Sequence, residues 1–259
     1  NYAALRQGLR GFNGQVVMAS KSYAQTPSAL IEAVEEARRE LDRDVIEIFH
    51  LHEVREPKLL DEKMRLLSTL ADLKNKGLIK TVGISTHSAK IAALAAKIEQ
   101  VEVIHPMLNK AGVGIIDGSV EDMIAACRLA KANGKGIYGM KALGGGSLAG
   151  RAQEMLDWAF SREYVDSFAL GMKSECEILN NIAWMEGRPS PCPEQVKNLQ
   201  RTVVFDENPC YKACGACVAK CSQRAINLKE DNSLKWIKAR CVYCGYCIAA
   251  CPVFNISIV

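Results

Sequence analysis

The sequence of 259 residues lacks any run of eighteen apolar residues, and it has no charged segment followed by an apolar stretch that ends in small residues. We therefore expect neither a membrane span nor a secretory signal. It also lacks a block of one charge, because 33 basic and 29 acidic residues are mixed along the chain. This mixture favours neither nucleic acid nor an anionic membrane as a partner, and we expect a cytoplasmic protein.

Cysteine, in contrast, is abundant and unevenly placed. Eight of the 11 cysteines lie between Cys210 and Cys251, whereas Cys127, Cys176 and Cys192 are scattered. In a small secreted protein this density would indicate disulfides. Here the cysteines follow a long segment without a leader and fall in C-x-x-C groups, which indicates metal binding in a reducing compartment.

The eight cysteines form two similar runs. The second run, with the spacing C-x2-C-x2-C-x3-C-P, consists of Cys241, Cys244, Cys247 and Cys251 followed by Pro252. The first run consists of Cys210, Cys214, Cys217 and Cys221. Its last three members each recur 30 residues later in the second run, and only Cys210 breaks the offset, by one extra residue. This repeat is typical of bacterial proteins with two iron–sulfur clusters.

Residues 208–259 resemble bacterial-type ferredoxins that bind two [4Fe–4S] clusters. In that arrangement the fourth cysteine of each run binds the other cluster. One predicted ligand set is Cys210, Cys214, Cys217 and Cys251, and the other is Cys241, Cys244, Cys247 and Cys221. A pair of zinc sites is the alternative, although zinc does not require four cysteines in this order twice.

Residues 1–186 alternate between apolar strand-like runs and helical patterns. The predicted strands are residues 16–20, 45–49, 80–84, 101–104, 136–140 and 167–171. Their starts lie 21 to 35 residues apart, the length of a βα unit. A parallel sheet with outer helices follows, either a (β/α)8 barrel or a doubly wound sheet. The chain lacks G-x-G-x-x-G after a strand, which argues against a doubly wound, dinucleotide-binding sheet.

Helix-capping patterns occupy the gaps between the predicted strands. Thr26 with Pro27, Ser88, and Ser119 with Asp122 are predicted N-terminal caps, and Asp61 is predicted to open a further helix that ends at Gly77. The caps therefore support alternating strands and helices.

Polar or sulfur-containing side chains follow the predicted strands in turn. They are Lys21, His52, Ser85, Asn109, Met140 and Lys173. In a barrel, the carboxyl ends of the strands meet at one mouth, where active sites lie. We therefore expect these side chains to gather there.

These residues make the segment similar to the aldo/keto reductase family, and the whole chain similar to its ferredoxin-tailed branch. The resemblance implies a (β/α)8 barrel that transfers hydride from NADPH to a carbonyl with an Asp-Tyr-Lys-His tetrad. It implies that Lys21 and His52 are catalytic. It also predicts cofactor binding by Ser85, Asn109, Met140, Lys173, Ser174 and Asn181.

The sequence departs from the family pattern in three ways. Thr86 replaces an Asn, and Met140 replaces the aromatic residue that usually stacks on the nicotinamide. The first two βα units, which would carry the catalytic Asp and Tyr, are absent, so we expect a truncated N-terminus. The predicted organisation is a partial barrel over residues 1–186, a linker over 187–207 and a small α+β ferredoxin domain over 208–259.

The predicted function is an iron–sulfur oxidoreductase that acts on a small carbonyl or alcohol substrate and exchanges electrons with a redox protein partner. A flavin could couple hydride to single electrons, although no flavin motif is present. The alternative is a non-catalytic electron carrier whose barrel serves as a docking scaffold. In a third hypothesis the clusters are purely structural.

Overall fold

The computed structural model describes residues 2–193, 202–205, 214–221, 223–241, 243, 245–251 and 255–258. The chain divides into two compact units. The first comprises Asn1–Met107, Asp117–Met140 and Glu163–Ser167, and the second comprises Leu108–Ile116, Lys141–Arg162 and Phe168–Val259. Within the described residues, every helix is too short or too polar to cross a membrane.

A six-stranded sheet follows the chain order β1-β2-β3-β4-β5-β6. Its strands are β1 (Ala19–Ser22), β2 (Ile46–Leu51), β3 (Ile79–Thr86), β4 (Val103–Pro106), β5 (Gly136–Met140) and β6 (Ser167–Ala169). β1 to β5 pair in parallel. A doubly wound sheet would reverse its strand order at a switch point, whereas this order runs in one direction, as in a barrel. The predicted partial (β/α)8 barrel is confirmed.

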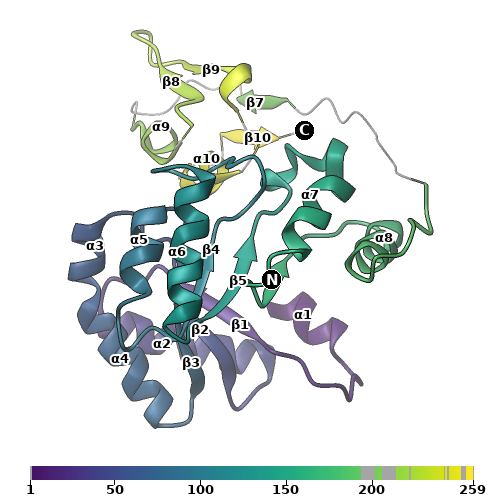
Figure 1. The fold of residues 1–259 in the computed structure, drawn as a ribbon. Coiled ribbons are helices and arrows are strands. Elements are labelled where there is room, and N and C mark those ends of the chain that lie inside the picture. Colours follow the sequence, from purple (N-terminus) through teal and green to yellow (C-terminus); the bar gives the residue numbers. More distant parts are fainter. Residues whose placement is uncertain are drawn as a thin grey trace. The chain divides into compact units, whose positions relative to one another are not determined.

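The helices of the first unit cover one face of this sheet (Figure 1). They are α2 (Pro27–Leu41), α3 (Pro57–Glu62), α4 (Met64–Asn75), α5 (Ala89–Ala95) and α6 (Val120–Ala132), and α1 (Tyr2–Gly8) precedes the sheet. The predicted caps are confirmed: the hydroxyls of Thr26 and Ser88 accept backbone N–H groups of their helices. Ser119 and Asp122 form a reciprocal capping box.

The predicted start of a helix at Asp61 is wrong. Pro57 opens the short α3, and α4 begins only at Met64. Between them Lys63 is 3% exposed, and its Nζ lies 3.4 Å from Ala24 O. This contact with a distant loop replaces a continuous helix.

The second unit begins with the loop 108–116 and continues after β5. It contains η1 (Gly144–Gly146), η2 (Ala149–Arg151), α7 (Ala152–Phe160) and α8 (Glu175–Met185). Ala142, Leu156, Ala159 and Trp184 form a buried cluster around which these elements pack.

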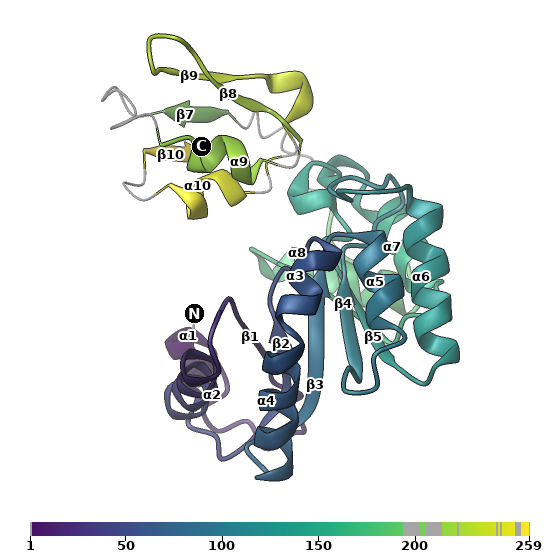
Figure 2. The ribbon, with the colours of Figure 1, turned by 90° about the vertical axis from the view of Figure 1, so that its left-hand side faces the viewer.

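The C-terminal part of this unit contains short elements in a repeated order. They are β7 (Val203–Phe205), α9 (Ala216–Lys220), β8 (Ile226–Leu228), β9 (Leu234–Trp236), η4 (Lys238–Arg240), α10 (Tyr246–Ala250) and β10 (Ile256–Ile258). α9 and β8 recur 30 residues later as α10 and β10. The helices α9 and α10 lie side by side (Figure 2). The repeat seen in the cysteines is thus also a repeat of structure, and the α+β ferredoxin-like domain is confirmed.

Candidate functional site

Three neighbouring strands bring the predicted catalytic residues to one edge of the sheet. In the register of β1 and β2, Lys21 lies opposite His50, and His52 N donates a hydrogen bond to Ser22 O at 2.9 Å. β3 then places Ser85 beside the end of β2. Parallel strands present their carboxyl ends together, so this arrangement follows from the register alone.

His52 is held by Ser85, which is fully buried. Its Nδ1 lies 2.8 Å from Ser85 Oγ, and the same oxygen accepts the N–H of Glu53 at 3.0 Å. The hydroxyl oxygen therefore serves two neighbours on the β2 end. This bond orients the imidazole ring relative to the sheet.

Glu53 links His52 to two residues outside the predicted site. Its backbone has φ 54°, a left-handed conformation that is uncommon for a residue with a side chain. Its buried carboxylate accepts a hydrogen bond from Tyr23 Oη at 2.9 Å and forms an ion pair with Arg55. The rings of Tyr23 and His52 lie 4.3 Å apart.

These contacts change the acidity of the Tyr23 phenol. Burial, followed by the negative charge of Glu53, raises the pKa of Tyr23 above its ordinary value. Sequence reasoning missed Tyr23, Glu53 and Arg55. The available signal was their position, two residues after Lys21 and one and three residues after His52.

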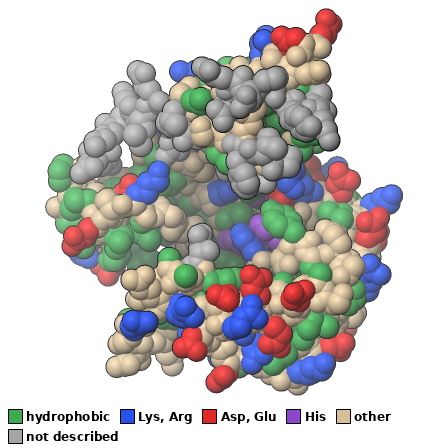
Figure 3. Space-filling view, turned by 180° about the vertical axis from the view of Figure 1, so that it is seen from behind, with side chains coloured by type: hydrophobic (Ala, Val, Ile, Leu, Met, Phe, Trp, Pro, Cys, Tyr) green, Lys and Arg blue, Asp and Glu red, His purple; other side chains and the backbone are tan. Residues whose placement is uncertain are grey.

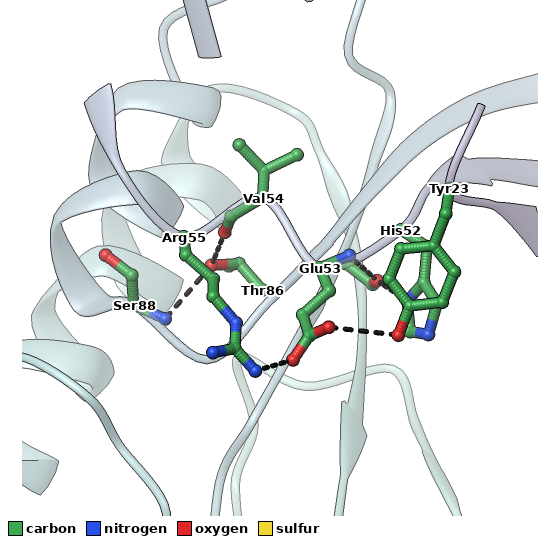
Figure 4. Close-up of polar contacts among 8 residues, drawn as sticks. Tyr23, His52, Glu53, Val54, Arg55, Thr86 and Ser88 are labelled. Carbon is green, nitrogen blue, oxygen red and sulfur yellow. Dashed lines mark hydrogen bonds and ion pairs between the residues drawn. The ribbon is translucent and has the colours of Figure 1, made fainter. Parts of the chain in front are cut away.

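Thr86, which departs from the family's Asn, braces the same loop (Figure 4). Its Oγ1 donates to Val54 O at 2.6 Å and accepts from Ser88 N at 3.0 Å. Both contacts are buried, so Thr86 stabilises the turn that follows His52.

A second polar layer lies deeper in the sheet. His50 is fully buried, its Nδ1 lies 3.1 Å from Ser20 O, and its Nε2 lies 3.2 Å from Tyr138 Oη. His105 Nδ1 lies 2.6 Å from Tyr138 O. Burial lowers the pKa of His50 to about 3 and that of His105 to about 4. Both rings are therefore neutral at pH 7, in accordance with the prediction that His50 is interior packing.

Lys21 adjoins this layer. Burial of its surroundings lowers the pKa of Lys21, and the charge of Glu53 raises it in part. Positive charge at Lys21 in turn lowers the pKa of both histidines. Acidic and basic side chains are otherwise interspersed over the face shown in Figure 3, where histidine is visible beside Lys or Arg.

The predicted cofactor residues fall in both compact units. Met140, at the end of β5, is 7% exposed and lies in the first unit with Ser85. Asn109 is fully buried in the second unit, where its amide bonds both N and O of Val113. Its side chain therefore closes the loop after β4.

Lys173, Ser174 and Asn181 lie at and within α8 in the second unit. Ser174 caps the helix by accepting from Glu177 N at 3.2 Å, and the Glu177 carboxylate accepts from Lys173 N at 2.7 Å. Convergence of these residues with those of the first unit stays a prediction.

The cysteine runs share one small core. Cys217 and Cys251 are buried there, and Cys241 and Cys247 pack against them. Cys214 is exposed and Cys221 is partly exposed, whereas Cys210 and Cys244 lie outside the described residues. The core thus brings together cysteines from both runs.

The fourth cysteine of each run accepts an equivalent hydrogen bond. Ala225 N donates to Cys221 Sγ at 3.1 Å, and Asn255 N donates to Cys251 Sγ at 3.2 Å. Among the described residues, no three His, Cys, Asp or Glu side chains converge as for a single metal ion. Cubane ligands bind different irons of one cluster and do not have to converge on one point.

Two family models match successive segments of the chain. A model of the aldo/keto reductase family matches residues 3–183, and a 4Fe–4S dicluster domain matches residues 209–255. A ferredoxin from Pyrobaculum islandicum is 42% identical over 55 residues, 21% of this chain and 50% of its own length. The thiosulfate reductase electron transfer subunit PhsB from Salmonella typhi is 32% identical over 81 residues, 30% of this chain and 42% of its own length. The chain thus spans half or less of these curated relatives.

The fold has solved counterparts. An aldo-keto reductase AKR11C1 from Bacillus halodurans superimposes with a TM-score of 0.57 at 19% identity, over 73% of this chain and 72% of that chain. A provisionally assigned aldo-keto reductase from Pseudomonas aeruginosa gives 0.59 at 20% identity, over 72% of each chain. These similarities support the fold of the sheet region.

Proposed function

The chain belongs to the aldo/keto reductase family, and on that premise we propose that it is an iron–sulfur oxidoreductase that transfers hydride between NADPH and a small carbonyl or alcohol. Two [4Fe–4S] clusters would pass electrons to or from a redox protein partner. Lys21 and His52 are its proposed catalytic residues.

The hydrogen bond between His52 and Ser85 carries this proposal. Ser85 Oγ accepts the N–H of Glu53, and we propose that it donates its own hydroxyl proton to His52 Nδ1, which lies 2.8 Å away. Donation from Ser85 to Nδ1 leaves the ring proton on Nε2. A protonated Nε2 can donate to a carbonyl oxygen and orient the substrate.

Lys21 acts through its charge. The family's tyrosine, which has no counterpart in this sequence, would protonate the developing alkoxide. A cation beside a phenol lowers the phenol's pKa, because it stabilises the anion. His50 and His105 are neutral at pH 7. Lys21 is therefore the residue among these three that can lower the pKa of the phenol by its positive charge.

NADPH would supply the hydride when bound. The Lys173 ammonium and Ser174, at the start of α8, suit its phosphate chemically. The Glu177 carboxylate already accepts from Lys173 N, so a phosphate placed there would have to displace it. The residues at the start of α8 therefore suit the NADPH phosphate only once the Glu177 side chain has moved away.

The cysteine runs fit iron–sulfur clusters by their chemistry. Thiolate sulfur is the usual ligand of such clusters, and N–H groups directed at the ligand sulfur tune the cluster potential. Ala225 N and Asn255 N make this contact at equivalent positions of the repeat. Two clusters, one for each pseudo-symmetric half, account for the duplicated contact.

Coupling the two parts requires a change in electron number. A nicotinamide gives up two electrons as hydride, whereas each cluster passes one. We therefore propose that a flavin or a quinone-like group, or the partner protein itself, mediates between them.

NADPH binding and hydride transfer test the enzyme proposal. We expect NADPH to quench protein fluorescence, and the 259-residue chain itself to show little or no carbonyl reduction. In a protein that also carries the family's tyrosine, we expect Lys21→Met to lower carbonyl reduction about a hundredfold with little change in NADPH affinity. Lys80→Met, which alters an exposed lysine of β3, is the matched control and should change neither. Equal losses of rate and affinity in Lys21→Met would make Lys21 structural and contradict its assigned role.

A non-catalytic electron carrier is the second candidate, favoured by the two curated relatives, which are a ferredoxin and an electron transfer subunit. In that case the sheet region docks a partner. Protein with intact clusters that fails to bind NADPH, yet is reduced by dithionite, would support the carrier and exclude the reductase.

A further inference from the structure

Three residues at four-residue spacing line one face of α8. They are Cys176, Asn180 and Trp184, and residues at this spacing lie above one another on a helix. Asn180 and Trp184 are buried, at 5% and 7% exposure. The face is therefore covered by another part of the second unit.

The segment after α8 returns along this face. Trp184 Nε1 donates to Ser190 Oγ at 2.8 Å. Asn180, one helical turn nearer the start of α8, contacts the next part of the returning segment. The Asn180 amide then holds the backbone of Cys192 at both ends: its Nδ2 donates to Cys192 O at 3.2 Å, and Cys192 N donates to its Oδ1 at 3.0 Å. Cys192 is therefore held beside Asn180, one helical turn from Cys176 on the same face of α8.

Cys176 lies near enough to Cys192 to raise the pKa of the Cys192 thiol, and both cysteines are partly exposed. Cys127, by comparison, is 2% exposed within α6. We propose that Cys176 and Cys192 form a reversible disulfide that locks the segment after α8 onto α8 itself.

The chemistry is thiol–disulfide exchange with a low-molecular-weight disulfide as the oxidant. One thiolate attacks that disulfide, forms a mixed disulfide and releases one thiol. The second cysteine displaces the other thiol and closes the bond. In sum, the two protein thiols lose two electrons and two protons, and the external disulfide takes them up as two thiols.

The consequence concerns the predicted linker, residues 187–207. In the reduced protein its first residues are held by hydrogen bonds alone, which thermal motion can open. In the oxidised protein a covalent bond anchors Cys192, so only the residues beyond it remain as a connection to the cluster domain. The disulfide would thus shorten the linker in response to redox conditions. In a reducing compartment such a bond is regulatory rather than permanent.

The test uses anaerobic protein with its clusters, equilibrated in glutathione buffers of increasing oxidation and then alkylated. Trypsin does not cleave before Pro189, so both cysteines leave in one peptide, residues 174–197. We expect this peptide to pass from doubly alkylated to unalkylated, two hydrogens lighter than the dithiol, while the cluster absorbance is unchanged.

Variants separate the proposal from general oxidation. Cys176→Ser and Cys192→Ser should each abolish the oxidised peptide, whereas Cys127→Ser should leave it unchanged. Asn180→Ala removes two hydrogen bonds that position Cys192 and should lower the equilibrium constant for closure about tenfold.

Amide exchange gives a second readout. Exchange of the Ser190 and Cys192 amide hydrogens should slow on oxidation in wild type and not in Cys176→Ser; the other residues of the stretch 189–193, Pro189, Pro191 and Pro193, have no amide hydrogen. Full alkylation of both cysteines at every potential below that at which the clusters bleach would overturn the proposal. Glutathione adducts without closure, or disulfide-linked dimers, would overturn it as well.

Discussion

The site at the carboxyl ends of β1 to β3, which contains Lys21, His52 and Ser85, differs from the cysteine runs in how its functional groups are positioned. In the sheet region, strand register sets the position of His52 relative to Ser85, and buried hydrogen bonds then fix the ring. In the cluster domain, a repeat of 30 residues sets equivalent positions, and each run contributes cysteines to one shared core. The first site is organised by its own hydrogen bonds, whereas in the second the two runs share one core.

The largest expected effect concerns the core that the two cysteine runs share. Cys251→Ser removes a ligand that we assign to the cluster of the first run, so iron content should fall by about half or more. The sheet region has its own core, and its unfolding followed by circular dichroism should be unchanged. Cys127→Ser is the matched control and should keep all its iron. Full iron retention in Cys251→Ser would contradict the assignment of Cys251 as a cluster ligand.

A tightly packed glycine tests the sheet side. A Cβ added to Gly83 would overlap the His50 ring and lie 3.0 Å from Val103 O. Gly83→Ala should therefore lower the free energy of unfolding of the sheet region by about 1–3 kcal/mol. Gly8→Ala, where nothing lies within 4 Å, is the control and should not destabilise it. A Gly83→Ala protein as stable as wild type in denaturant would show that the histidine layer is loosely packed.

Acid should weaken the same layer. The pKa values of His50 and His105 in the folded state, about 3 and about 4, lie below the ordinary value of 6.5. Folding thus favours the neutral rings, and their contribution to stability is complete above about pH 6.5 and is lost as the pH falls toward 4. The thermal midpoint of wild type should drop more steeply between pH 7 and 4.5 than that of His50→Gln. Parallel slopes would mean that His50 does not resist protonation.

The smallest expected effect concerns Tyr23. Replacing Glu53 by Gln removes a negative charge beside the phenol, so the pKa of Tyr23 should fall. Phenolate absorbance, taken as the difference from Tyr23→Phe, would measure it. The transition of Tyr138, whose pKa is raised by burial, should not move. If the Tyr23 transition did not move, the charge of Glu53 would not be a cause of the raised pKa of Tyr23.

Much of the sheet region could be predicted, because its signals are local. Apolar periodicity indicated the six strands, and short polar caps indicated three helix starts. Lys21 and His52 could be expected near one edge because parallel strands end together. Their convergence with the predicted cofactor residues on α8 involves two compact units, and it remains a prediction.

The missed features depend on contacts between distant segments. The left-handed backbone at Glu53 and its bonds to Tyr23 and Arg55 have no local pattern, since glutamate rarely adopts that conformation. The break at Lys63 depends on a loop nearly forty residues earlier in the chain. In the cluster domain the repeat indicated α10 and β10 from α9 and β8, whereas the pairing of β7 with β10 joins segments some fifty residues apart.

Metal analysis of the anaerobically purified chain tests the central claim most directly. We expect brown protein that contains iron and inorganic sulfide equal to two [4Fe–4S] cubanes per chain and that bleaches with dithionite. Colourless protein free of inorganic sulfide, or zinc in place of iron, would contradict it.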